Sequence, residues 1–185
     1  MLLVAAVALI PGASANKLTQ ASEEKMGLDS HSGVLRVREV LEERGFEPAE
    51  VVELERTARS AAEAADALGV RVAQIVKSLV LRGRETGRAA LVLAGGANRV
   101  DVNKTSRLLS EPVEMADAAY VREKTGFAIG GVPLLGHAER PETFLDEGLL
   151  LVREVWAAAG HTHVVFGLEL AELVRLTGGQ VVAFR

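Results

Sequence analysis

Hydrophobic residues recur along this chain with two different periods, which predicts short helices interspersed with short strands. Apolar residues stand at helical spacing from Val34 to Leu41, and Gly45 ends the segment. The runs 78–81 and 89–93 are instead almost wholly apolar and flank a charged turn at 82–88. This pattern indicates a β-hairpin that is covered on both faces.

The best local helix signal is a capping box, in which the Ser60 hydroxyl and Glu63 satisfy the first amides of an Ala-rich helix that ends at Gly69. Residues 72–75 suggest one short helical turn. Further helices are expected at 102–109, 118–124 and 168–176, and further strands at 51–54, 113–115, 164–166 and 181–184. Strands and helices do not alternate strictly, so we expect an α+β domain with a mixed, largely antiparallel β-sheet core surrounded by helices.

The first 31 residues differ from the rest. An apolar run at 2–10 precedes Ala13-Ser14-Ala15, which resembles a secretory signal, but no basic residue stands before the run. A start site at Met26 is the alternative that we favour. We therefore expect 1–31 to be a disordered or detachable extension, and 32–185 to be a single domain.

Charge is unevenly distributed along the chain. The formal net charge is −4, yet the segment 71–107 carries eight basic side chains and only two acidic ones. This segment suits a partner whose phosphates touch one side of the protein, although a solvated surface is an equally good interpretation. The chain has no cysteine, which excludes disulfides, thiolate nucleophiles and Cys-type zinc sites.

The segment 126–137 is the least regular part of the chain. It contains Gly126, Gly130, Gly131, Gly136 and Pro133, and it ends at His137. Glycine permits unusual backbone angles and lets a ligand approach the main chain, whereas proline fixes its own φ. We expect either a plain connection between core elements or a loop that presents backbone N–H groups to a ligand.

A few side chains outside this loop are candidates for chemistry. Lys77 stands at the start of an apolar strand, so its stem must lie along buried surface, either as a snorkelling residue or as a positioned cation. His137 is a candidate proton carrier. His161 and His163 could begin a metal site, but no third ligand is evident and Gly160 favours a hairpin turn, so we expect neither metal nor cofactor.

The segments 76–79 (Val-Lys-Ser-Leu) and 125–133 (Thr-Gly-Phe-Ala-Ile-Gly-Gly-Val-Pro), in this order and spacing, resemble the YbaK/ProX family of trans-editing aminoacyl-tRNA deacylases. The resemblance extends from about Val34 to the end of the chain. It includes Leu145-Asp146-x-x-Leu149-Leu150 and Ala159-Gly160. The family is similar to the editing domain of bacterial prolyl-tRNA synthetases.

The resemblance implies hydrolysis of the ester that joins a wrongly attached small amino acid, such as Cys or Ala, to the 3′ end of a tRNA in the cytoplasm. It implies Lys77, Gly130 and Gly131 as catalytic residues. The residues expected to bind the substrate are Ser78, Pro133, Gly136, His137, Asp146 and Gly160. Those expected to bind tRNA are Arg82, Arg84, Arg88, Arg99 and Lys104. A prolyl-tRNA synthetase is a candidate partner, and no membrane partner is expected.

Two positions depart from the family pattern. Leu134 stands where many relatives have a second proline, so the pocket wall differs. Ser78 follows the lysine where alanine-specific relatives usually have Asn, which favours the broader group that acts on Cys-, Ala- and other small aminoacyl-tRNAs. A non-catalytic tRNA-binding module on the same fold is the main alternative function. A secreted protein of unrelated role is a third, which requires 1–15 to be a genuine signal.

Overall fold

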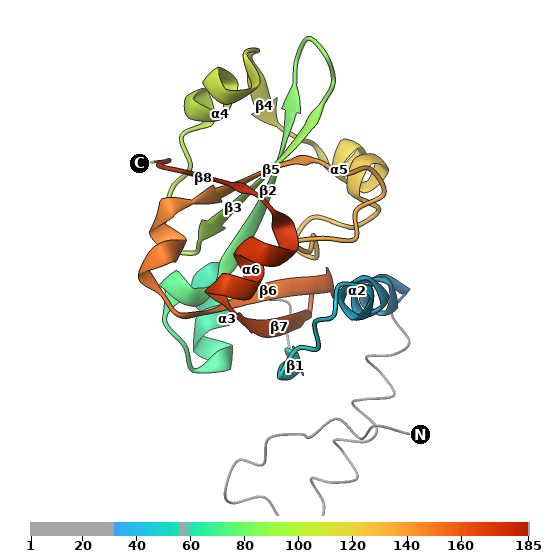
Figure 1. Ribbon diagram of the computed structural model, residues 1–185, viewed down its shortest axis with the longest axis vertical. Coiled ribbons are helices and arrows are strands. Elements are labelled where there is room, and N and C mark those ends of the chain that lie inside the picture. Colours follow the sequence, from blue (N-terminus) through green and yellow to red (C-terminus); the bar gives the residue numbers. More distant parts are fainter. Residues whose placement is uncertain (1–31, 56–57, 59, 185) are drawn as a thin grey trace, which may run out of the picture.

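The computed structural model describes residues 32–55, 58 and 60–184. The expectations about the extension 1–31 lie outside the described residues. Within that part of the chain, strands and helices form the expected α+β arrangement (Figure 1).

Five strands form the larger sheet, in the order β4-β2-β3-β5-β8. The predicted hairpin is its centre, because β2 pairs antiparallel with β3 in a register that places Lys77 opposite Ala94. Strand β4 pairs antiparallel with β2. On the other side of the hairpin, β5 pairs parallel with β3, and β8 pairs parallel with β5. The bounds are β2 Val76–Gly83, β3 Ala89–Gly95, β4 Val113–Met115, β5 Glu142–Asp146 and β8 Gln180–Val182.

Three further strands form a separate antiparallel sheet in the order β1-β7-β6. Their bounds are β1 Glu50–Glu53, β6 Glu154–His161 and β7 Val164–Glu169. An isolated bridge between Ile75 and Trp156 links the two sheets. The sequence pattern had not indicated this division, because strand periodicity shows that a segment is extended but not which segment it pairs with.

The helices lie around the sheets, and among the described residues no helix is long and apolar enough to cross a membrane. Their bounds are α2 Ser32–Glu43, α3 Ala61–Leu68, α4 Val102–Leu109, α5 Ala118–Thr125 and α6 Leu170–Thr177, with short 3-10 helices η1 Val72–Gln74 and η2 Glu147–Leu151. The Ser60 cap is confirmed, since its side chain accepts from the Glu63 amide, and Gly69 ends the helix in the left-handed conformation.

Gly160 differs from the prediction of a hairpin turn. The turn between β6 and β7 consists of Thr162 and His163, while Gly160 lies inside β6 with a φ of 89°. The register between β6 and β7 shifts between Ala158 and His161. Gly160 therefore stands at an irregularity within a strand, where the positive φ favours glycine. A sequence pattern does not distinguish such an irregularity from a turn.

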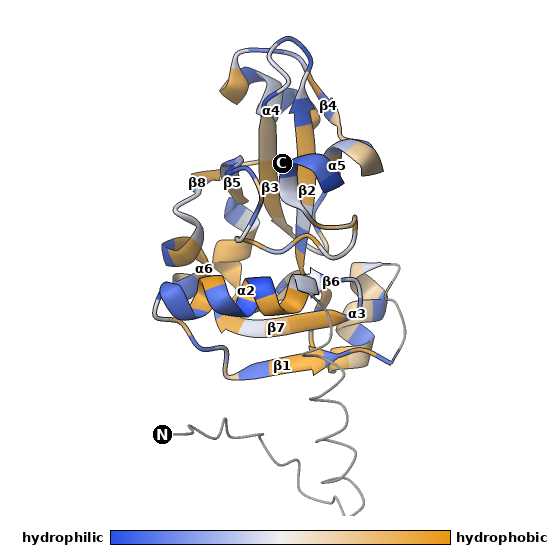
Figure 2. Cartoon of the chain, turned by 90° about the vertical axis from the view of Figure 1, so that its right-hand side faces the viewer, coloured by the Kyte–Doolittle hydropathy of each residue, from blue (hydrophilic) through white to orange (hydrophobic). Residues whose placement is uncertain are grey.

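The larger sheet is buried on both faces, as the apolar hairpin predicted. On one face Val76 and Val80 join a core shared with α2 and the smaller sheet. On the other face Leu81 packs in a second cluster with residues of α4 and β5. Figure 2 shows β2 and β3 mostly in the hydrophobic colours, and both hydrophobic and hydrophilic residues on α2.

A buried carboxylate holds the tip of the β2–β3 hairpin. Glu111 is 6% exposed and accepts the Thr86 hydroxyl at 2.5 Å and the Thr86 and Glu85 amides at 3.0 and 2.9 Å. Arg88 adds an ion pair at 3.2 Å. These hydrogen bonds, the Thr86 hydroxyl foremost, lower the pKa of Glu111 to about 2 from an ordinary 4.5.

We expect Glu111 to make the stability of the fold depend on pH. A carboxylate with a lowered pKa in the folded state contributes fully above 4.5, and its contribution is lost as the pH falls from 4.5 toward 2. The Glu111→Gln variant should lose stability at neutral pH and show a flatter decline over that range. Urea unfolding at a series of pH values measures this. The exposed neighbour variant Glu85→Gln should follow the wild type, and an unchanged slope in Glu111→Gln would contradict the prediction.

Candidate functional site

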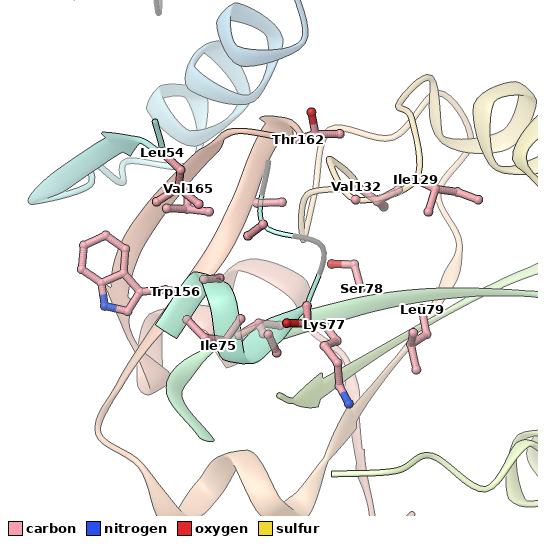
Figure 3. A pocket seen from close by; sticks show the side chains of 17 residues that line it. Leu54, Ile75, Lys77, Ser78, Leu79, Ile129, Val132, Trp156, Thr162 and Val165 are labelled. Atoms are coloured by element: carbon pink, nitrogen blue, oxygen red, sulfur yellow. The ribbon is translucent and has the colours of Figure 1, made fainter. Parts of the chain in front are cut away.

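A cavity of about 340 Å³ opens where the start of β2 meets the smaller sheet. Most of its lining is apolar and small, and the polar side chains are Ser60, Lys77, Ser78 and Thr162. None of the described lining residues carries a carboxylate, an imidazole or a thiol. The lining consists of Leu54, Ala58, Ser60, Ala61, Ala64, Ile75, Val76, Lys77, Ser78, Leu79, Ile129, Gly130, Val132, Trp156, Ala158, Thr162 and Val165 (Figure 3).

The glycine loop forms one wall of this cavity for steric reasons. Helix α5 ends at Gly126 with a φ of 80°, which turns the chain toward the smaller sheet. A Cβ on Gly131 would lie 2.9 Å from the His161 carbonyl carbon, so only glycine lets the loop approach the β6–β7 turn this closely. Gly130 has a φ of 88° and lines the cavity beside Ile129, a residue that is 57% exposed.

Lys77 and Ser78 leave opposite sides of β2, because neighbouring side chains alternate along a strand. Figure 3 shows the Ser78 hydroxyl on the side of Val132 and Thr162, and the Lys77 ammonium pointing the other way. The ammonium donates a hydrogen bond to the backbone carbonyl of Asn98. Burial lowers the pKa of Lys77, and the negative charge of Asp146 opposes this decrease.

Asp146 lies at the end of β5 and is fully buried. One carboxylate oxygen accepts the side-chain amide of Asn98. It therefore cannot touch a substrate in this structure, although it was expected to bind one. The structure instead joins it to Lys77 through Asn98, a residue to which the sequence analysis gave no role. The only local signal was that Asn98 follows two glycines at the end of an apolar strand, where Asn commonly stabilises turns.

Other expected substrate residues lie outside this cavity. Gly136 and His137 line a separate cavity of about 240 Å³ together with residues of α2 and α6. The His137 Nε2 atom lies 2.9 Å from the Pro133 carbonyl oxygen, and burial lowers the pKa of His137. Pro133 is buried. Gly160 packs on α2, where a Cβ would meet the Gly33 carbonyl oxygen at 2.4 Å.

The basic segment does not form one uniform charged surface. Arg84 pairs with Glu114 at 2.8 Å, and Arg88 pairs with Glu111 at 3.2 Å and with Glu142 at 3.8 Å. The Arg82 guanidinium carbon lies 5.2 Å from the centroid of the Tyr120 ring, and the Lys104 ammonium donates to the Ala183 carbonyl at 2.9 Å. Arg99 is exposed and adjoins Asn98.

These cations also differ in their distance from the cavity. Arg82, Arg84 and Arg88 belong to the hairpin arm that extends away from the smaller sheet (Figure 1). Arg84 stands seven residues beyond Lys77, which corresponds to roughly 23 Å of extended strand. Arg99 instead adjoins Asn98, the residue that contacts Lys77. A nucleic acid that touched both groups would have to span the length of β2.

The geometry defines a small apolar cavity with hydroxyls and a glycine backbone at its edge. Such a site suits a small side chain beside a polar bond, and backbone N–H groups in a glycine loop can stabilise a developing negative charge. A cation sits on the reverse side of the same strand. Among the described residues, no group of three or more His, Asp or Glu side chains could hold a metal ion.

Two known proteins are similar to this chain in sequence. YwhH of Bacillus subtilis, an uncharacterised protein, is 32% identical over 132 residues, which cover 71% of this chain and 83% of YwhH. EbsC of Enterococcus faecalis, a candidate Cys-tRNA(Pro)/Cys-tRNA(Cys) deacylase, is 28% identical over 122 residues, which cover 65% of this chain and 74% of EbsC.

A solved structure supports the same relationship. The crystal structure of a candidate trans-editing enzyme for prolyl-tRNA synthetase is 47% identical in sequence, with a TM-score of 0.77 over 84% of this chain and 98% of that one. The aminoacyl-tRNA editing domain family matches residues 55–176, which contain β2, the glycine loop and every described lining residue except Leu54. On this combined match of sequence and fold, the chain belongs to the aminoacyl-tRNA editing domain family.

Proposed function

We propose that this protein hydrolyses mischarged aminoacyl-tRNA, removing a small amino acid such as cysteine or alanine as a trans-editing step of translation in the cytoplasm. The observation that carries the proposal is the cavity that joins Ser78 on β2 to Gly130 in the glycine loop. Its volume of about 340 Å³ is at the low end for small-ligand sites, which favours a small aminoacyl group.

In this proposal the aminoacyl side chain occupies the apolar part of the cavity, among Ala61, Ala158 and Val165. The ester carbonyl lies at the polar edge, where the Gly130 amide polarises it. A preorganised donor of this kind is typically worth ~3 kcal/mol in the transition state. The Gly131 amide donates to the Ala128 carbonyl at 3.0 Å, so Gly131 contributes by holding the loop in shape. The Ser78 hydroxyl lies on the same side of β2 and orients the ester.

Water is the nucleophile in this reaction. As the water adds to the ester carbonyl carbon, its proton passes to the oxygen of the free hydroxyl on the substrate's own terminal ribose. That hydroxyl gives its own proton to the ester oxygen of the ribose as the bond from this oxygen to the carbonyl carbon breaks. The products are the free amino acid and a tRNA with an intact 3′ end. No nucleophilic side chain of the protein is needed, in keeping with a described lining that has no thiol or imidazole.

Lys77 holds the terminal nucleotide rather than the ester carbonyl. Its ammonium leaves β2 on the side away from Ser78, so it suits a phosphate of the acceptor end that passes around the strand. Arg99 lies next to the turn that binds Lys77 and extends this contact. The acceptor end of aminoacyl-tRNA is the proposed partner. A prolyl-tRNA synthetase is a further candidate, since one similar structure is described as an enzyme that edits for it.

We expect Lys77→Ala to reduce deacylation by at least about 100-fold, because the terminal nucleotide is no longer held and the ester it carries is misplaced in the cavity. The measurement is the release of labelled amino acid from a panel of Ala-, Cys-, Ser- and Thr-charged tRNAs, including mischarged tRNA-Pro. Lys124→Ala is the matched control, because Lys124 pairs with Glu139 at 2.9 Å outside the cavity. Its activity should match the wild type.

The same panel decides between the catalytic and the binding function. If wild-type protein binds tRNA but releases no amino acid from any of these substrates, the deacylase proposal fails and a tRNA-binding module remains. If Lys77→Ala retains full activity while the wild type is active, the reaction stands and the assignment of Lys77 is wrong.

The basic residues should contribute unequally to tRNA binding. We expect Arg99→Ala to reduce the slope of log affinity against log salt by about one phosphate contact. Arg84→Ala should reduce it less, because Glu114 already neutralises that guanidinium. Filter binding of tRNA at several salt concentrations measures both slopes. Equal slopes in the two variants would show that the hairpin arm contacts tRNA as strongly as the turn beside Lys77.

A further inference from the structure

Asp146 is an unusual residue to find fully buried. One of its carboxylate oxygens accepts the Asn98 side-chain amide, while the other is buried and has no hydrogen-bond partner. Burying a carboxylate costs free energy unless hydrogen bonds or an opposite charge compensate it. A single amide satisfies only one of the two carboxylate oxygens. Packing alone therefore does not explain a buried aspartate at this position.

The contacts of Asn98 connect this carboxylate to Lys77. Its side chain donates to Asp146, and its backbone carbonyl accepts the Lys77 ammonium. The backbone amide of Asn98 donates to the Gly95 carbonyl at 2.9 Å, and the backbone amide of Gly96 donates to the Ile75 carbonyl at 2.7 Å. These backbone hydrogen bonds tie the turn after β3 to the residues that precede β2. Asp146 holds the side chain of Asn98.

Among the described residues, Lys77 faces few other charges. Its partner across the hairpin is Ala94, which carries none. Arg99 adjoins the turn and Glu147 follows Asp146, but both are exposed to solvent. Lys104 of α4 donates to the Ala183 carbonyl. Of these charged groups only Asp146 is buried, so its charge is the least screened.

We propose that Asp146 is a positioning residue for Lys77, which holds the ammonium in place through Asn98 and balances its charge from the interior of the larger sheet. This inference rests on the proposed function, since Lys77 is assigned there to the acceptor end of tRNA. Asp146 itself touches no substrate. It acts from the interior of the larger sheet, on the side of β2 where Lys77 lies. This positioning role takes the place of the substrate contact expected from the sequence.

The charge of Asp146 has a consequence that can be measured. Burial lowers the pKa of Lys77 and Asp146 raises it. Removing the carboxylate therefore lowers the pKa of Lys77 further, and the ammonium is lost at a lower pH. The alkaline decline of deacylation should move to lower pH in Asp146→Asn. Activity lost at alkaline pH should return as the pH is reduced, which a merely structural defect would not produce.

The experiment compares the pH dependence of kcat and KM for Asp146→Asn, Asn98→Ala and Glu147→Gln against the wild type. Asp146→Asn keeps the shape of the side chain and should lose about tenfold in kcat/KM at alkaline pH, as is common for residues that support a functional group. Asn98→Ala keeps the backbone carbonyl and the charge of Asp146. It should lower kcat/KM at all pH values without moving the alkaline decline. Glu147→Gln removes an adjacent exposed charge and should match the wild type.

A second measurement does not depend on deacylation. In protein labelled with ¹³C at the lysine ε-carbons, the Lys77 resonance is identified by its absence in Lys77→Arg, and it is titrated in the wild type and in Asp146→Asn. A titration at lower pH in Asp146→Asn supports the inference even if no tRNA substrate is hydrolysed. Coincident titrations in the two proteins would overturn it, whatever the outcome of the activity assays.

Discussion

The alternation of side chains along β2 is the constraint on which the rest of the site depends. The strand is buried on both faces, so each residue is assigned to one of two interiors. Ser78 falls on the side of the cavity, and Lys77 falls on the side of Asn98 and Asp146. A shift of one residue in the β2–β3 register would exchange these two sides and bury the apolar residues against the wrong partners.

The cavity exists because a second sheet closes the end of this strand. The β6–β7 hairpin accepts the glycine loop at a distance that excludes a side chain on Gly131. The bridge between Ile75 and Trp156 holds the smaller sheet against the start of β2. Small residues of α3 and β6 leave the space that larger side chains would fill. The aminoacyl group proposed for this space is therefore limited in size by backbone packing as much as by side chains.

The charges of the basic segment serve two purposes. The arginines of the hairpin arm are partly neutralised by acidic neighbours. The Arg88–Glu111 ion pair, together with the Thr86 hydrogen bond to Glu111, stabilises the tip of the arm. Arg99 instead adjoins Asn98, whose backbone carbonyl accepts the Lys77 ammonium. A sequence count of basic residues treats both groups alike, although ion pairing leaves less charge on the arm for a nucleic acid.

The sequence by itself determined the positions of most helices and strands, the caps at Ser60 and Gly69, the α+β class and the family, because these depend on short-range periodicity and on motifs. It also identified Lys77 and the glycine loop as candidates. Only the tertiary structure showed that the strands form two sheets and that His137 lines a different cavity. It alone also showed that Asn98 connects Asp146 to Lys77. These features depend on which faces of distant segments meet, and a local pattern of polar and apolar residues does not contain that information.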